Sequence, residues 1–263
     1  MHPSKHSPVG VFDSGVGGVS VLREALAYLP HENYIYYGDN GNAPYGDRSE
    51  DEITSLTLRC IRLLVAKGCK AILVACNTAT ANCIHSIRAE MDVPVVSVEP
   101  ALKPACAQNG SGKVFMMATL ATTRLERYLA LQQRMPSPSR IVNIPCPGLV
   151  NRIEQGQFEA AAFDDLFDRY LAPYEGCEVD GIVLGCTHYI FIKDAFRRAA
   201  ARHLQGACTL YDGNAGTVHQ LAHVLQAHQL ANPNGSAQVD FYTSGDYDFY
   251  KKLFDALLKR EIG

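Results

Sequence analysis

Two cysteines stand in matching contexts in this chain of 263 residues. Cys76 ends the apolar run of ILVACNTAT (72–80), and Cys186 ends the apolar run of GIVLGCTHYI (181–190). Small residues that can hydrogen-bond follow each cysteine. A thiol at the end of a strand and just before a helix meets the positive end of the helix dipole, which favours the thiolate. Both cysteines are therefore candidates for acid–base chemistry.

Two titratable side chains are candidate partners of these thiols. His188 lies two residues after Cys186, where an imidazole can exchange a proton with a thiol. Asp13 ends another apolar run, VGVFD (9–13), and could serve Cys76 in the same way. In open α/β sheets, ligands bind beyond the carboxyl ends of the strands, so these strand ends are expected to form a site.

The remaining cysteines are interpreted as ordinary buried side chains. The chain has nine cysteines, and no two of them form a CxxC pair, which argues against a zinc ribbon or a thioredoxin-type redox site. In a reducing cytosol, most cysteines are small hydrophobic core residues. Cys186 and His188 alone are too few ligands for a metal ion. No metal site is therefore expected.

A pair of thiols on opposite walls of a cleft suits the racemisation of an amino acid. Inversion at the α carbon requires a base on one face and an acid on the other. A thiol pKa of about 8.5 can be shifted either way around neutral pH, so one thiolate and one thiol could serve both roles. A Cys-His hydrolase is an alternative, but it leaves the second cysteine unexplained. A non-catalytic protein that binds an amino acid or a protein partner is another.

Short apolar runs alternate with helical patterns almost throughout the chain. One helix is predicted from a capping-box signal at Ser49 and Glu52 to a stop at Gly68, and another over 246–260. This alternation predicts parallel sheets covered by helices. The predicted strands are 9–13, 34–38, 71–75, 93–98, 114–118, 141–145, 181–185, 209–212 and 239–243.

Nine strands are too many for one mononucleotide-binding unit. We therefore expect two α/β lobes with one cysteine strand in each, and a (βα)8 barrel is the alternative fold. No low-complexity linker marks the boundary. The chain is expected to cross between the lobes near SVEPALKPA (97–105) and near GACTLYDG (206–213).

The bulk composition indicates a soluble globular protein. A hydrophobic content of 47% and a charged content of 19% argue against disorder. A net charge of −3 offers no electrostatic footprint for nucleic acid or an anionic membrane surface. No apolar run approaches the roughly 18–20 residues that span a bilayer, and MHPSKHSPVG lacks the apolar core of a signal peptide. A cytoplasmic protein is expected.

Two further loops follow predicted strands. DSGVGG (13–18) has three glycines, which let backbone N–H groups at a helix N-terminus meet an anion. It has neither the GxGxxG spacing of a dinucleotide site nor the Lys-Ser/Thr of a P-loop. The second loop, in YYGDNGNAPYG (36–46), carries Asp39, which is either a ligand-site carboxylate or an Asx-turn residue.

Four motifs together closely resemble those of the cofactor-independent glutamate racemases of the aspartate/glutamate racemase superfamily. They are VGVFDSGVGG, APYG, ILVACNTAT and IVLGCTHY, in the family's order, and the resemblance covers about residues 9–213. It implies two doubly wound, Rossmann-like α/β lobes related by pseudo-two-fold symmetry, with the active site in the cleft between them. It further implies residues 1–98 and 208–263 for the first lobe and 99–207 for the second.

The resemblance also implies roles for individual residues. Cys76 would act on the D-glutamate face and Cys186 on the L-glutamate face, with Asp13 and His188 as their polar partners. Glu154, in CPGLVNRIEQG, resembles an acidic residue near the family's site, and Asp39 is a second auxiliary candidate. The motifs place substrate-holding residues at Ser14, Tyr45, Gly46, Asn77, Thr78, Thr119, Thr122 and Thr187.

Two stretches depart from the family's pattern. Ile190 follows GCTHY where proline is common. Asn40, Gly41 and Asn42 precede Ala43 where a Ser or Thr and a basic residue are expected. These departures concern loop geometry and substrate tuning, since neither removes a side chain from the chemistry.

The sequence thus predicts an enzyme that converts L-glutamate to D-glutamate for peptidoglycan synthesis, with two cysteines and with neither a metal nor pyridoxal phosphate. Glutamate is the expected partner, and nucleic acid and membrane are not. A homodimer is expected because family members are commonly dimers. The nearest alternative is an aspartate or other amino-acid racemase of the same superfamily, which would keep both cysteines and differ in its side-chain pocket.

Overall fold

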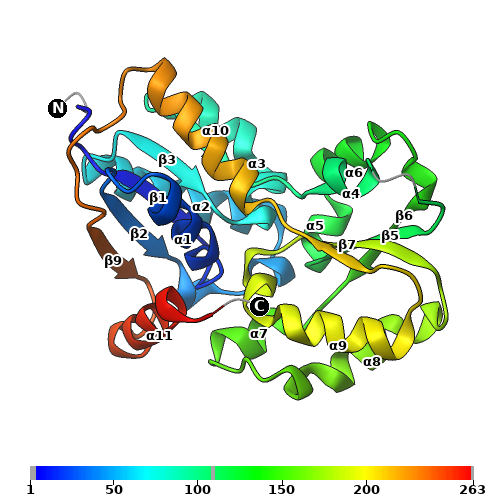
Figure 1. The fold of residues 1–263 in the computed structure, drawn as a ribbon. Helices are drawn as coiled ribbons and strands as arrows, with labels where there is room; N and C mark the ends of the chain where they lie inside the picture. Colours follow the sequence, from blue (N-terminus) through cyan, green and yellow to red (C-terminus); the bar gives the residue numbers. More distant parts are fainter. Residues whose placement is uncertain (1–3, 108–109, 262–263) are drawn as a thin grey trace.

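The computed structural model describes residues 4–107 and 110–261, and the chain forms two separate parallel sheets (Figure 1). The first sheet has the strand order β4-β3-β1-β2-β9 and the second β6-β5-β7-β8. Two open sheets confirm the predicted pair of α/β lobes and rule out the barrel. The ends of the predicted first lobe, 1–3 and 262–263, lie outside the described residues.

The first sheet is covered by helices on both faces. Along β1, Val9 and Val11 pack toward α1, α10 and α11, whereas Phe12 packs toward α2 and α3. This alternation explains why the strand is apolar throughout. The elements are β1 (Val9–Asp13), α1 (Val19–Tyr28), β2 (Tyr34–Gly38), η1 (Asn40–Asn42), η2 (Tyr45–Asp47), α2 (Glu50–Ala66), β3 (Ala71–Val74), α3 (Asn77–Glu90), β4 (Val95–Ser97), α10 (Asn214–Ala227), β9 (Val239–Thr243) and α11 (Tyr247–Lys259).

The second sheet is built in the same way. Phe115 and Met117 of β5 face α8 and α9, and Val114 and Met116 face α4 and α6. The elements are α4 (Leu102–Cys106), β5 (Lys113–Ala118), α5 (Leu120–Arg124), α6 (Glu126–Gln133), η3 (Pro138–Arg140), β6 (Ile141–Pro145), α7 (Leu149–Glu154), η4 (Ala160–Phe163), α8 (Asp164–Leu171), η5 (Ala172–Tyr174), β7 (Val179–Leu184), η6 (Thr187–Ile192), α9 (Lys193–His203) and β8 (Thr209–Tyr211).

Local signals in the sequence set several element ends. Helix α2 begins after a capping box, in which the Ser49 hydroxyl accepts from the N–H of Glu52 at 3.4 Å and the Glu52 carboxylate accepts from the N–H of Ser49 at 3.0 Å. Helix α11 begins after Asp246, whose carboxylate accepts from the N–H of Phe249 at 2.8 Å. All nine predicted strands are present. The strand expected at 93–98 is the one that shortens most, to Val95–Ser97.

The two sheets repeat one topology. Strands β4-β3-β1-β2 of the first sheet correspond in order and direction to β8-β7-β5-β6 of the second, and β9 is an additional edge strand. In each repeat the first strand lies between the second and the third, so the strand order reverses there. Ligands bind at such switch points. Asp13 ends β1 and Cys76 follows β3, while Thr119 and Cys186 follow the equivalent strands β5 and β7.

The second crossing between the lobes differs from the expected boundary at 207/208. Strand β8 pairs with β7, so residues 209–211 belong to the second sheet. The chain then returns to the first lobe and passes close to the first crossing, near residue 99. A Cβ placed on Gly213 would lie only 2.1 Å from the carbonyl oxygen of Glu99. We propose 99–211 as the second lobe, with residues up to 98 and from 212 as the first.

Candidate active site

Cys76 lies at the junction of β3 and α3. Its Sγ accepts a hydrogen bond from the N–H of Ala79 at 3.5 Å, so the thiol caps the helix, and it donates to the Ser14 hydroxyl at 3.4 Å. Burial, and then the negative charge of Asp13, raise the pKa of Cys76 to about 12. The expected stabilisation of the thiolate by the helix end is present, but burial outweighs it.

Cys186 has a different neighbour. Its Sγ lies 3.6 Å from Nδ1 of His188, and Nε2 on the other side of the ring lies 2.6 Å from Oε1 of Glu154. Burial disfavours a charged imidazole, but the negative charges of Cys186 and Glu154 outweigh it and raise the pKa of His188 well above its ordinary value. The histidine is therefore suited to hold a positive charge beside this thiol. The helix expected directly after Cys186 begins as the 3-10 segment η6.

Asp13 connects the two lobes at the end of β1. One carboxylate oxygen accepts from the N–H of Gly15 at 3.0 Å, and the other accepts from the Thr187 hydroxyl at 3.5 Å. The side chain is fully buried, and burial raises its pKa despite the attraction of His188. A carboxyl whose pKa is raised keeps its proton to higher pH than an exposed aspartate does.

Three threonine hydroxyls form a cluster between the lobes. Oγ1 of Thr78, on α3, lies 2.9 Å from that of Thr119 and 3.2 Å from that of Thr122, and the last two lie 2.9 Å apart. Thr78 belongs to the first lobe and the other two to the second. Each hydroxyl carries one proton, so a hydroxyl that turns away from its neighbour can donate that proton to an oxygen atom of a ligand.

Both thiols line the same small pocket. Its volume is at most about 270 Å³, and it also contains Asn77, whose Oδ1 is buried and meets no donor among the described residues. An unpaired buried acceptor in a pocket is a place for a ligand N–H. The lining residues are Asp13, Ser14, Pro44, Tyr45, Gly46, Cys76, Asn77, Thr78, Thr119, Val150, Cys186, Thr187 and His188.

Three candidate residues stand behind this lining. Thr122 reaches it through the threonine cluster, and Glu154 through His188. Asp39 accepts from the hydroxyl of Tyr45 at 2.6 Å and from the side-chain amide of Asn42 at 2.9 Å, so it supports a pocket residue.

Two lining residues were not among the predicted site residues. Pro44 lies within the APYG motif, next to two residues that were. Val150 lies four residues before Glu154, so the two share one face of α7. That spacing was the available signal, because the helix that brings Glu154 to the site must bring Val150 as well.

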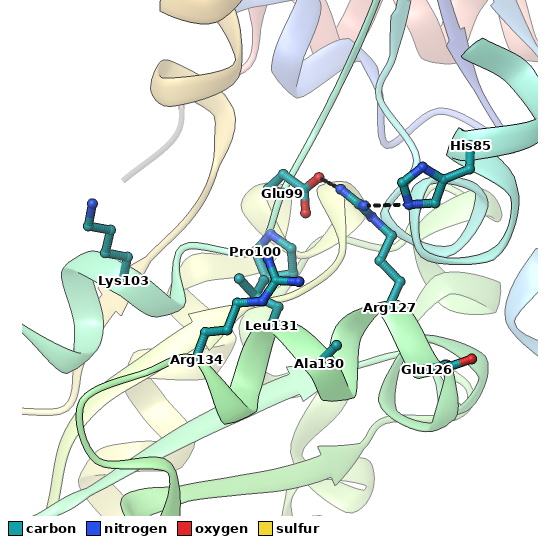
Figure 2. Close-up of a pocket in the computed structure, with 9 residues that line it drawn as sticks. All are labelled: His85, Glu99, Pro100, Lys103, Glu126, Arg127, Ala130, Leu131 and Arg134. Carbon is teal, nitrogen blue, oxygen red and sulfur yellow. Dashed lines mark hydrogen bonds and ion pairs between the residues drawn. The ribbon is translucent and has the colours of Figure 1, made fainter. Parts of the chain in front are cut away.

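A larger cavity, with a volume of at most about 1060 Å³, lies elsewhere and contains neither thiol. Figure 2 shows Arg127 between Glu99 and His85; the guanidinium pairs with Glu99 and lies 3.2 Å from Nε2 of His85. Lys103 and Arg134 line the same cavity. It is the larger space, but the smaller pocket holds the acid–base groups, and chemistry rather than size selects the candidate site.

Two kinds of feature are absent from the described residues. Within residues 4–107 and 110–261, no three His, Cys, Asp or Glu side chains are grouped so that they could hold a metal ion. In the same residues, no helix combines the length and the apolar character needed to cross a bilayer.

Known proteins resemble this chain in sequence and in fold. The glutamate racemase of Herpetosiphon aurantiacus is 41% identical over 254 residues, which is 96% of this chain and 98% of that protein. The glutamate racemase of Clostridium perfringens strain SM101 is 40% identical over 252 residues, 95% of this chain and 93% of that protein. The crystal structure of glutamate racemase from Francisella tularensis in complex with D-glutamate has a TM-score of 0.83 at 25% identity, covering 98% of this chain and 96% of that one.

A sequence model of a whole family matches as well. The model described as Asp/Glu/Hydantoin racemase matches residues 14–221, which include both thiols, both crossings between the lobes and the threonine cluster. The two-sheet architecture and the pocket are thus found together with the family's sequence pattern. The chain belongs to the Asp/Glu/hydantoin racemase family.

Proposed function

We propose that this protein interconverts L-glutamate and D-glutamate, and that Cys76 and Cys186 exchange the α proton. The observation that carries the proposal is that the two thiols, one from each lobe, line a single pocket. The names of the relatives and the D-glutamate bound to the Francisella enzyme support glutamate as the substrate.

In the proposed reaction, one thiolate removes the proton from the α carbon and becomes a thiol. The electron pair left on carbon is delocalised into the adjoining carboxylate. The opposite thiol then gives its proton to the other face and becomes a thiolate, so the configuration inverts and the charge balance is kept. Cys76 serves the D-glutamate face and Cys186 the L-glutamate face, and the enzyme ends in the opposite protonation state.

The pocket offers partners for both ends of the substrate. The unpaired Oδ1 of Asn77 can accept from the α-ammonium group, and the threonine hydroxyls can donate to a carboxylate. The ammonium group also brings a positive charge beside Cys76. That charge opposes the effects of burial and of Asp13, so substrate binding lowers the pKa of Cys76 toward the range in which it can lose its proton.

We extend the proposal to the role of the product and to the assembly. D-Glutamate from this reaction would supply peptidoglycan synthesis in the cytoplasm, and the protein would act as a homodimer. Family resemblance supports these points. Rescue of a bacterial strain that requires D-glutamate tests the role, and sedimentation equilibrium tests the dimer.

The decisive experiment is racemisation in D2O. Each enantiomer of glutamate should yield the other with deuterium at the α carbon. If Cys76→Ser and Cys186→Ser both keep full racemisation, the two-thiol mechanism is wrong. Turnover of aspartate in preference to glutamate would move the enzyme to the neighbouring specificity. Release of ammonia from glutamine through a covalent acyl-enzyme, unaffected by Cys76→Ala, would indicate the hydrolase.

A further inference from the structure

Asn40 makes two hydrogen bonds that join distant parts of the molecule. It follows β2, and its side chain is almost fully buried. Its Nδ2 donates to Oε2 of Glu154 at 2.9 Å, and its Oδ1 accepts from the hydroxyl of Thr243 at 2.8 Å. Glu154 belongs to α7 of the second lobe, and Thr243 ends the edge strand β9 of the first. The amide therefore links β9 to the carboxylate behind His188.

The hydrogen bonds of Thr243 fix the orientation of this amide. The Thr243 hydroxyl accepts from the N–H of Gly245 at 3.0 Å, so its one proton is free to go to Asn40. A flipped amide would point its oxygen at the Glu154 carboxylate and its NH2 group at the Thr243 hydroxyl. The first contact would be repulsive, so the hydrogen-bond network selects the orientation in which Asn40 donates to Glu154.

Glu154 connects the Asn40 side chain to the thiol site, because its carboxylate contacts both Asn40 and His188. Its Oε1 accepts from the N–H of Val16 at 2.7 Å and lies 2.6 Å from Nε2 of His188, while Oε2 accepts from Asn40. Asn40 is thus the partner of the oxygen that does not face the histidine. Without it, the carboxylate can turn about its terminal bond, and the contact with the imidazole loses its fixed geometry.

We propose that Asn40 is a positioning residue, which acts through Glu154 to hold the His188 imidazole against Cys186 and is itself oriented by Thr243. The inference rests on the proposed function and adds to it a residue that touches neither the pocket nor the substrate. It gives the departure at Asn40 from the family's pattern a role, because this side chain can donate to Glu154 and accept from Thr243 at once.

Other titratable groups face the same pair and stay unchanged in the test variants. They come from three elements and the loop after β7: Asp13 of β1, Tyr36 of β2, Tyr250 of α11 and Cys186. A change seen on altering Asn40 or Thr243 therefore reports on the Asn40–Glu154 contact. Because Glu154 stabilises the charged imidazole, a looser contact moves the titration of His188 to lower pH.

The test is an imidazole 15N NMR titration of His188, assigned by its loss in His188→Gln. Asn40→Ala should move the midpoint down by about one pH unit. Thr243→Val should move it in the same direction by less, and Thr243→Ser, which keeps the hydroxyl, should leave it at the wild-type value. The alkaline limb of kcat/KM should shift with the midpoint, equally in both directions of racemisation because the equilibrium constant is fixed.

Two results would overturn the inference. One is a wild-type midpoint in folded Asn40→Ala, as judged by circular dichroism. The other is a shift in Thr243→Ser as large as that in Thr243→Val. If Asn40→Ala does not fold, the pair of Thr243 variants decides. The titration needs no turnover, so a wild-type enzyme that fails to racemise glutamate would refute the proposed function and leave the positioning role to be judged from the midpoints.

Discussion

The two thiols occupy equivalent places in the two lobes but have opposite electrostatic surroundings. Cys76 follows the third strand of the first repeat and lies near the negative charge of Asp13. Cys186 follows the third strand of the second and lies 3.6 Å from His188, which has a raised pKa. Fold symmetry therefore places two thiols in one pocket, and asymmetric neighbours give them different surroundings. The proposed reaction needs a base and an acid that differ, and the neighbours can supply that difference.

Removal of either thiol is the strongest way to break this comparison. Cys76→Ala and Cys186→Ala should each lower racemisation by about a thousandfold or more, since each removes the acid or the base of one face. Cys69→Ala is the matched control, because Cys69 is buried like both thiols and, like Cys76, has its pKa raised to about 12, but lies outside the pocket. Chiral chromatography measures the rates. Equal loss in the control would point to damage to the fold.

The neighbours can be altered while both thiols stay. His188→Gln removes the positive charge beside Cys186 and should slow the alkylation of that thiol at neutral pH. Asp13→Asn removes the negative charge beside Cys76 and should lower the pKa of that thiol and speed its alkylation. Each variant should lose about tenfold to a hundredfold in kcat. Alkylation by iodoacetamide as a function of pH, followed by mass spectrometry of each cysteine, measures the two rates, and changes of the same sign would contradict the comparison.

The threonine cluster is shared by the lobes and should affect binding more than proton transfer. Thr78→Val removes one of its three hydroxyls and should raise KM about tenfold, with a smaller effect on kcat. Thr57→Val is the control, because the Thr57 hydroxyl is buried and has no hydrogen-bond partner among the described residues. It should leave KM unchanged. A drop in kcat alone for Thr78→Val would instead place this hydroxyl in the chemical step.

The sequence allowed the prediction of much of this arrangement, for physical reasons. A continuous apolar strand followed by a cysteine and small polar residues is a local pattern, so both thiols could be placed at strand ends. Parallel strands then bring those ends to one edge. The contact of Asn40 with Glu154 could not be predicted in this way, because it joins positions 114 residues apart across two lobes. The predicted boundary put residues 209–211 in the first lobe, whereas β8 pairs with β7 in the second sheet. So short a strand carries no signal for the strand with which it will pair.

The smallest expected effect is on thermal stability. Variants beside the two thiols should shift Tm in opposite directions. His188 has a folded pKa above its unfolded value, so it stabilises the fold fully below the unfolded pKa, and this contribution is lost as pH rises through the folded pKa. Asp13 also has a raised folded pKa, so its ionisation costs the folded state stability as pH rises above the unfolded pKa. At pH 7, His188→Gln should therefore lower Tm and Asp13→Asn should raise it, each by a few degrees, since Tm changes by roughly 2–4 °C per kcal/mol.

Calorimetry at pH 7 and pH 4 checks this prediction. The gain in Asp13→Asn should shrink at pH 4, where more of the wild-type carboxyl is protonated than at pH 7. A gain that stays constant with pH would mean that Asp13 acts on stability through packing rather than through its charge.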